Sequence, residues 1–163
     1  MSLKDVLGLN ARNHLYAARY NPRSAKWLAN SKLLTKSALR KAKLPVPRLY
    51  RVFRKEAEVD KFDFSRLSGS FVVKPNRGFG GEGIVVIDTG GTFAGEWVDA
   101  GGVVWRVADF KLHVQDILEG RFSIDDVPDI AFVEERIPIH PVFAKYAYQG
   151  APDIRVIVFN RIP

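Results

Sequence analysis

The sequence predicts an α+β fold in which helices come first and a small set of strands follows. Residues 2–18 and 31–43 carry apolar side chains at helical spacing. Beyond residue 47, short runs of β-branched residues bounded by glycine and proline replace that pattern. At 163 residues, of which 47% are hydrophobic, the chain is long enough to bury one ordinary core.

The two helices expected in the N-terminal third have recognisable ends. The sequence Tyr20-Asn-Pro22 ends the first helix, because a proline removes a backbone donor and restricts the residue before it. Ser31 suits the N-cap of the second helix, and Pro45 and Pro47 stop it. Residues 56–62 are expected to form a short helix or a loop.

Strands are expected on both sides of a glycine-rich segment. The four expected strands are Leu49–Phe53, Phe71–Val73, Ile84–Ile87 and Ile130–Ile137. A hairpin-like piece carries Trp97, and Val107–Leu118 forms a helix with Gly120 placed to end it. Ile154–Phe159 is predicted to be one more strand of buried type.

The glycine-rich segment is the strongest indication of function. Lys74 follows the apolar run Phe71–Val73, and four glycines come next, at positions 78, 80, 81 and 83. Such a loop turns its backbone N–H groups onto an anion, and the lysine adds a positive charge. The expected ligand is a nucleoside triphosphate. The alternative is a flexible hairpin whose glycines serve only the turn, although a two-residue turn needs fewer.

Two familiar phosphate-binding motifs do not fit this segment. A Walker A loop has Gly-Lys-Ser/Thr after its glycines and opens a helix, whereas here the lysine comes first and a strand follows. A Rossmann fingerprint also opens a helix.

Positive charge is concentrated in the N-terminal third. Residues 1–54 contain thirteen Lys/Arg and a single acid, Asp5, which gives +12, so the remaining 109 residues sum to −5 within the net charge of +7. This charge suits nucleotide phosphates, nucleic acid or an acidic partner, or it is a solvated helical surface.

Several classes of protein do not fit the composition. The chain contains no cysteine, so it has neither disulfides nor thiolate metal sites, and its histidines, His14, His113 and His140, lack ligand spacing. No run approaches the ~18 apolar residues of a membrane span, and the N-terminus lacks the apolar stretch of a signal peptide. We therefore expect a cytoplasmic protein without a membrane partner.

Taken in order, the motifs resemble the ATP-grasp superfamily and, within it, the alpha-L-glutamate ligase-related proteins. The stretches that carry the resemblance are Asn10-Ala-Arg-Asn13 with Tyr20-Asn-Pro-Arg23, Lys32-Leu-Leu-Thr-Lys36 with Leu44-Pro-Val-Pro47, Phe71-Val-Val-Lys-Pro75 with Gly78–Ile84, Phe132-Val-Glu-Glu-Arg-Ile137, and Asp153-Ile-Arg-Val156. They span nearly the whole chain. The resemblance implies an ATP-grasp-like fold with a helical basic segment at 1–47, a small lid subdomain at 48–137, and a larger subdomain that starts at 138–163 and is truncated.

The resemblance also implies roles for particular residues. Lys32 and Lys74 would be the two cations on the nucleotide phosphates, and Arg155 would be catalytic, facing the phosphate or the acyl acceptor. Ser31 stands where family members often carry an acid before the first lysine. The residues of the lid and of the adenine-binding linker would be Gly80, Gly81, Gly83, Glu134, Glu135 and Ile137.

The reaction implied by the family is ATP-dependent ligation of a carboxylate to an amine through an acyl phosphate. Its magnesium is held by an acid and a Glu-x-Asn motif, which no segment after Asp153 supplies, so Mg²⁺ ligands are expected beyond residue 163. Asp125, Asp126 and Asp129 precede the linker and are expected to form a solvated turn.

The chain is therefore expected to be the nucleotide-binding half of a ligase, without activity by itself. An unpaired sheet edge would favour self-association or association with the missing half. The alternative function is a non-catalytic basic module that binds RNA or an acidic partner. Nucleic acid is the less favoured partner, because aromatic residues in the basic third are irregularly spaced. An ATP-dependent phosphotransferase of the same superfamily is the nearest enzymatic alternative.

Overall fold

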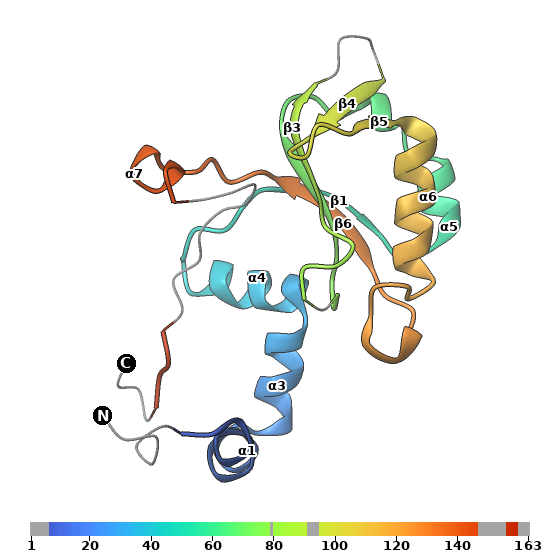
Figure 1. Cartoon of the computed structure of the whole chain (residues 1–163). Coiled ribbons are helices and arrows are strands. Elements are labelled where there is room, and N and C mark those ends of the chain that lie inside the picture. The colour runs from blue at the N-terminus through green and yellow to red at the C-terminus, as the bar shows by residue number, and fades with distance from the viewer. Residues whose placement is uncertain (1–6, 79, 91–94, 147–155, 160–163) are drawn as a thin grey trace. The chain divides into compact units, whose positions relative to one another are not determined.

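A computed structural model of the 163-residue chain describes residues 7–78, 80–90, 95–146 and 156–159. The chain divides into two compact units, Met1–Val46 and Pro47–Pro163 (Figure 1). The first unit is helical where it is described, and the second is built on an antiparallel sheet. The predicted α+β fold class agrees with this architecture. The finer division at residues 137 and 138 stays a prediction.

The N-terminal unit consists of short helical segments. They are α1 (Leu9–Ala11), the π-helical η2 (Arg12–Ala17), α2 (Ala18–Tyr20), α3 (Arg23–Asn30) and α4 (Lys32–Lys41). The first run ends at Tyr20 as predicted, and the Ser31 hydroxyl accepts the Leu34 N–H at 3.2 Å as the predicted N-cap of α4. Helix α3 was not predicted, because Tyr20-Asn-Pro22 was interpreted only as the end of the first helix and residues 23–30 were not assigned.

Six strands form one sheet in the second unit. They are β1 (Leu49–Phe53), β2 (Phe71–Pro75), β3 (Val85–Gly90), β4 (Glu96–Asp99), β5 (Val104–Arg106) and β6 (Ala131–Glu135), in the spatial order β1-β6-β2-β3-β4-β5. Every neighbouring pair is antiparallel. The expected strands near Phe71 and Ile84 therefore do pair, and β6 inserts beside β2 from far along the chain.

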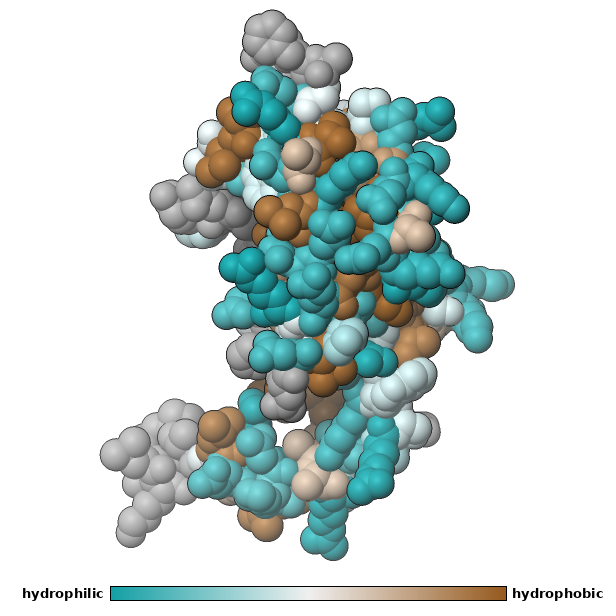
Figure 2. All heavy atoms as spheres, turned by 90° about the vertical axis from the view of Figure 1, so that its right-hand side faces the viewer, coloured by the Kyte–Doolittle hydropathy of each residue, from teal (hydrophilic) through white to brown (hydrophobic). Residues whose placement is uncertain are grey.

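Two helices, α5 (Glu56–Asp60) and α6 (Val107–Leu118), lie on one face of this sheet (Figure 1). Their outer side is mainly hydrophilic, with apolar side chains between the polar ones (Figure 2). Helix α6 has the predicted bounds, and Gly120 follows it with φ +94°, a backbone conformation that favours glycine at a helix end. The remaining segments are the 3₁₀ turns η3 (Phe64–Arg66) and η4 (Ile124–Asp126) and the short helix α7 (Pro141–Ala144).

The core lies between α6 and the sheet. Alternate residues of the central strands, such as Phe71, Val73 and Val133, are buried there with Phe110 of α6. Because side chains alternate between the faces of a strand, the intervening residues of β2 and β6 are left on the face without α5 and α6. That second face carries the predicted lysine.

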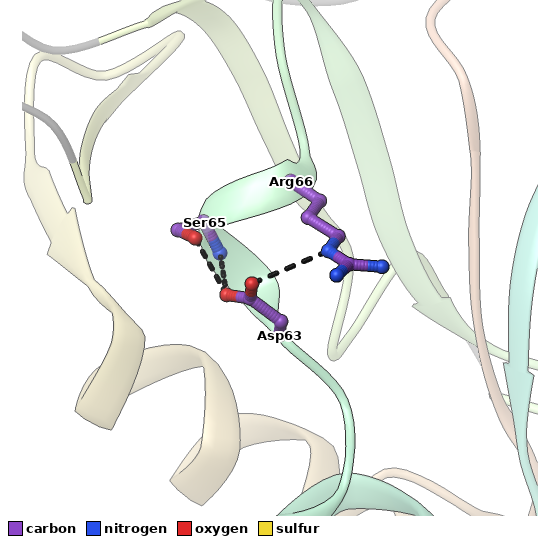
Figure 3. Close-up of polar contacts among 3 residues, drawn as sticks. All are labelled: Asp63, Ser65 and Arg66. Atoms are coloured by element: carbon purple, nitrogen blue, oxygen red, sulfur yellow. Dashed lines mark hydrogen bonds and ion pairs between the residues drawn. The ribbon is translucent and has the colours of Figure 1, made fainter.

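A local hydrogen-bonded turn places one core phenylalanine. The Asp63 carboxylate accepts the Ser65 backbone N–H at 3.1 Å and the Ser65 hydroxyl at 2.5 Å, and Arg66 Nε lies 3.3 Å from its second oxygen (Figure 3). The hydrogen bond from Ser65 is the main cause that lowers the pKa of Asp63. The turn directs Phe64, which is fully buried, under the sheet.

The last predicted strand differs from the structure. Of Ile154–Phe159, residues 156–159 are described; their four side chains are exposed, and they form no strand. The apolar composition of this run therefore did not determine its burial.

Candidate functional site

The candidate site lies on the face of the sheet opposite α5 and α6. In the register of β2 and β6, Val72 is opposite Glu134 and Lys74 is opposite Phe132. These four side chains alternate with the core residues of the same strands, so they share the second face. The sheet thus places the predicted lysine and one predicted acid side by side.

Lys74 and Glu134 form an ion pair on this face. The Glu134 side chain is 3% exposed and the Lys74 side chain is 22% exposed, so the acid is buried and the lysine is partly accessible to solvent. The Lys74 ammonium also lies 5.6 Å from the centre of the Phe132 ring, where a cation is attracted. A lysine held in this way keeps its charge at a fixed point beside the glycine loop.

The start of the glycine loop is fixed by backbone hydrogen bonds. Asn76 donates its N–H to the Ile130 carbonyl at 2.8 Å, and Arg77 donates its N–H to Asp129 Oδ2 at 2.6 Å. A Cβ on Gly78 would lie 2.1 Å from Pro75 Cγ, so a side chain there would force the loop away from the strand. The loop therefore leaves β2 in a defined direction.

The end of the loop is fixed by the layer beneath the sheet. His113 of α6 lies with its Nε2 2.9 Å from the Gly83 carbonyl oxygen. Gly83 has φ +70°, and a Cβ there would lie 2.6 Å from Phe122 Cγ, which leaves no room for a side chain. Only glycine fits this contact without a shift.

The tip of the loop is open. Gly80 and Gly81 have φ +59° and +89°, and a Cβ on either would meet nothing within 4 Å. Their conformation, not the space around them, favours glycine. Phe79 lies outside the described residues. A loop with fixed ends and an open glycine tip suits approach of its backbone to an anion.

The other two linker residues, Glu135 and Ile137, lie at the end of β6 and just after it. Glu135 donates its backbone N–H to the Arg48 carbonyl at 2.8 Å, and Arg48 donates its N–H to Glu135 Oε2 at 3.0 Å, so the predicted acid is tied to the residue before β1. Arg136 forms an ion pair with Asp88 of β3. Ile137 is 58% exposed. An open pocket of about 430 Å³ lies beside this segment, lined by Tyr50, Ser68, Gly69, Ser70, Glu135, Arg136 and Pro138.

Two predicted site residues, Lys32 and Arg155, lie outside the described part of the second unit. Lys32 is the first residue of α4 and belongs to the N-terminal unit. Arg155 lies outside the described residues. Their roles stay predictions.

Asp129 is a correction to the sequence-based expectation of a solvated turn. It is 7% exposed, and its carboxylate holds the Arg77 N–H at the start of the glycine loop. Asp126, by contrast, is exposed as expected. Asp129 and His113 are the two residues that the sequence did not connect with the loop.

Removing the Asp129 carboxylate tests its hydrogen bond with the Arg77 N–H. We expect Asp129→Ala to lower the free energy of unfolding by about 1–2 kcal/mol, because the Arg77 N–H loses its acceptor in a partly buried place. Urea unfolding measures this. Asp60→Ala is the exposed control and should change stability by no more than about 0.5 kcal/mol; equal costs for both would contradict the assigned role.

Neither a metal cluster nor a membrane span is found in the described part of the chain. No group of three or more His, Asp or Glu side chains there is arranged to hold a metal ion. Among the same residues, no helix is both long and apolar enough to cross a membrane.

Comparison with known proteins adds one finding. The family model described as sugar-transfer associated ATP-grasp matches residues 11–163. No curated protein and no solved structure matches the chain. The match covers the lysine strand, the glycine loop and the segment after β6.

Proposed function

Because this chain belongs to the sugar-transfer associated ATP-grasp family, we propose that it binds ATP as part of an ATP-dependent carboxylate–amine ligase. The family gives an ATP-binding module of ligase type. The carboxylate–amine chemistry and the particular likeness to alpha-L-glutamate ligase-related proteins go beyond that and are proposals.

One observation carries the proposal. Lys74 lies on the face of the sheet opposite α5 and α6, and the strand that holds it leads directly into a glycine loop whose two ends are fixed and whose tip is open. A point charge beside a row of accessible backbone N–H groups binds a polyphosphate by charge and by hydrogen bonds together. The plain hairpin alternative does not explain why both ends of the loop are held.

In the proposed complex the residues have distinct tasks. Lys74 neutralises phosphate charge, and the N–H groups at Gly80, Gly81 and Gly83 cover the phosphates and exclude water. Lys32 would supply a second cation. The base would lie along the segment from Glu134 and Glu135 to Ile137, where backbone groups after β6 receive its polar edge. Arg155 would face the acyl phosphate or its acceptor.

The proposed reaction has two steps. A carboxylate oxygen forms a bond to the γ-phosphorus as the bond to the β–γ bridging oxygen breaks, and ADP leaves. An amine then attacks the acyl carbon, phosphate leaves, and the amine loses a proton. Magnesium in such reactions neutralises phosphate charge when it is bound. For this chain the proposal is ATP binding, and the identities of acid and amine stay open.

Titration with a non-hydrolysable ATP analogue tests the proposal. We expect Lys74→Ala to weaken binding roughly 10-fold or more, since a hydrogen bond to a charged group contributes about 1.5–3 kcal/mol. Lys74→Gln keeps a hydrogen-bond donor for Glu134 and so separates loss of the positive charge from loss of that hydrogen bond. Isothermal titration calorimetry gives the dissociation constants.

The exposed Lys61 provides the matched control. Lys61→Ala should leave the affinity within about twofold, because surface charges act weakly at a distance. Equal binding by the wild type and both Lys74 variants would refute the phosphate role. Absence of ATP binding, with RNA binding that is lost when basic residues of the N-terminal unit are neutralised, would favour the basic module instead.

A further inference from the structure

We propose that His113 is a positioning residue for nucleotide binding: from the helical layer beneath the sheet it fixes the end of the glycine loop and so aims the loop's tip at the phosphates. This inference rests on the proposed ATP binding. His113 belongs to α6, on the face of the sheet opposite Lys74, so its effect would be transmitted through Gly83.

The contact between His113 and Gly83 has a defined direction. A carbonyl oxygen only accepts, so the 2.9 Å contact requires the hydrogen to be on Nε2 of His113. The two residues are 30 positions apart, and His113 belongs to α6. A residue of α6 thus holds the Gly83 carbonyl at the end of the loop.

Aromatic packing fixes the imidazole ring itself. Its centre lies 5.5 Å from the ring of Trp105 and 5.4 Å from that of Phe122. Phe122 also touches Gly83, where a Cβ would lie 2.6 Å from its Cγ. Phe122 therefore packs against both the His113 ring and Gly83, so a shift of either one disturbs the other.

The position of this contact in the loop determines its effect. Gly81 and Gly80 stand two and three residues before Gly83, and nothing lies within 4 Å of a Cβ on either. The tip consequently takes its direction from the fixed ends. Releasing Gly83 would let the tip sample more orientations, and ordering it again on binding would cost entropy.

Charges around the ring make the anchor sensitive to pH. Burial lowers the pKa of His113 from its ordinary value of 6.5; the Gly83 hydrogen bond and Asp116 oppose this, and Arg121 adds to it. His113 and Asp116 line a surface pocket, and Asp109 of α6 lines it as well. The neutral ring is thus the form that fits, and a proton on Nδ1 places a charge among apolar rings.

The lowered pKa of His113 determines how stability changes with pH. An imidazole whose pKa is lower in the folded than in the unfolded chain stabilises the fold fully above about pH 6.5. This contribution is lost as the pH falls through that value toward the lowered pKa. Anchoring of the loop should weaken over the same range, and ATP affinity with it.

Two substitutions of His113 separate anchoring from general stability. His113→Leu removes the donor, whereas His113→Gln carries an amide N–H that can replace Nε2. We expect the leucine variant to bind the ATP analogue about 3- to 10-fold more weakly at about pH 7.5, and the glutamine variant to stay within about twofold. His14→Leu, on the exposed surface of the N-terminal unit, is the control and should not change the affinity.

A pH series supplies a second measurement that needs only the glutamine variant. Between about pH 7.5 and about pH 5.5 the wild type should lose several-fold more affinity than His113→Gln. Phosphate groups titrate near pH 6 as well, so the two proteins are compared at each pH. If His113→Leu fails to fold, the pH series with His113→Gln still tests the positioning role.

The outcomes distinguish the two proposals. If the wild type binds the analogue and Lys74→Gln weakens it, but His113→Leu binds as the wild type does, the positioning role is wrong and the ATP site stands. Parallel pH profiles of wild type and His113→Gln would also overturn the role. If the wild type does not bind the analogue at all, both proposals fall.

Discussion

Replacing Phe110 with alanine is expected to lower the free energy of unfolding by about 3–5 kcal/mol, the range for truncating a buried aromatic side chain. Phe110 is 0% exposed and stands at the centre of the core between α6 and the sheet. Four aromatic rings surround it, with centroid distances of 6.0 Å to Phe64, 5.7 Å to Phe71, 5.2 Å to Trp97 and 5.3 Å to Trp105. Their spread over η3, β2, β4 and β5 limits how far the cavity can collapse.

Urea unfolding followed by tryptophan fluorescence measures this effect, because Trp97 and Trp105 are neighbours of the substituted ring. Leu112→Ala is the matched control on the same helix. Its side chain is 62% exposed, so the loss should be no more than about 0.5 kcal/mol. A similar cost for both substitutions would show that the core is not organised around Phe110.

Local sequence signals predicted the elements that depend on local physics. Helix α6 has an apolar pattern with a glycine behind it, and its bounds were predicted correctly. The cap at Ser31 and the strand at Leu49–Phe53 were predicted for similar reasons. Helix α3 was missed, although Pro22 stands at its N-cap, a place where proline fits a helix start and does not by itself signal a loop.

The burial of Ile154–Phe159 could not be predicted from its composition. An apolar β-branched run indicates a buried strand only if neighbouring segments cover it. In the described residues 156–159 the side chains are exposed. The sequence indicated a strand propensity for this run, but it did not indicate which segments pack against it.

The site was predicted in its local part and missed in its long-range part. Lys74 and the glycines are adjacent in sequence, so their combination could be recognised. The residues that hold the loop are remote: Asp129 is 52 positions from Arg77, and His113 is 30 positions from Gly83. Neither contact has a periodic or compositional signal. Only the insertion of β6 beside β2 and the packing of α6 under the sheet bring them together.

Glu134→Ala is the second substitution with a large expected effect, about 2–3 kcal/mol of lost stability. Breaking a buried ion pair leaves one charge without its counterion, which costs about 3–5 kcal/mol when both groups are buried. Here the remaining group is Lys74, whose side chain is 22% exposed and can be partly hydrated, so the expected cost is smaller. Urea unfolding measures it without any nucleotide.

A double-variant cycle identifies the ion pair as the cause. Lys74→Met combined with Glu134→Leu removes both charges and fills similar volume, so it should cost less than the sum of the two single substitutions. Additive costs would mean that the two side chains contribute independently. The exposed pair of Arg106 and Glu96, with exposures of 69% and 25%, is the control, and Glu96→Ala should cost less than about 1 kcal/mol.

The same variants connect stability with the proposed function. If Glu134 only balances the charge of Lys74, the double variant should be folded and yet bind the ATP analogue about as weakly as Lys74→Gln, because both lack the cation that faces the phosphates. A folded double variant with wild-type affinity would separate the ion pair from nucleotide binding. Glu134 would then be a structural residue of the sheet, and phosphate binding would have to depend on the glycine loop alone.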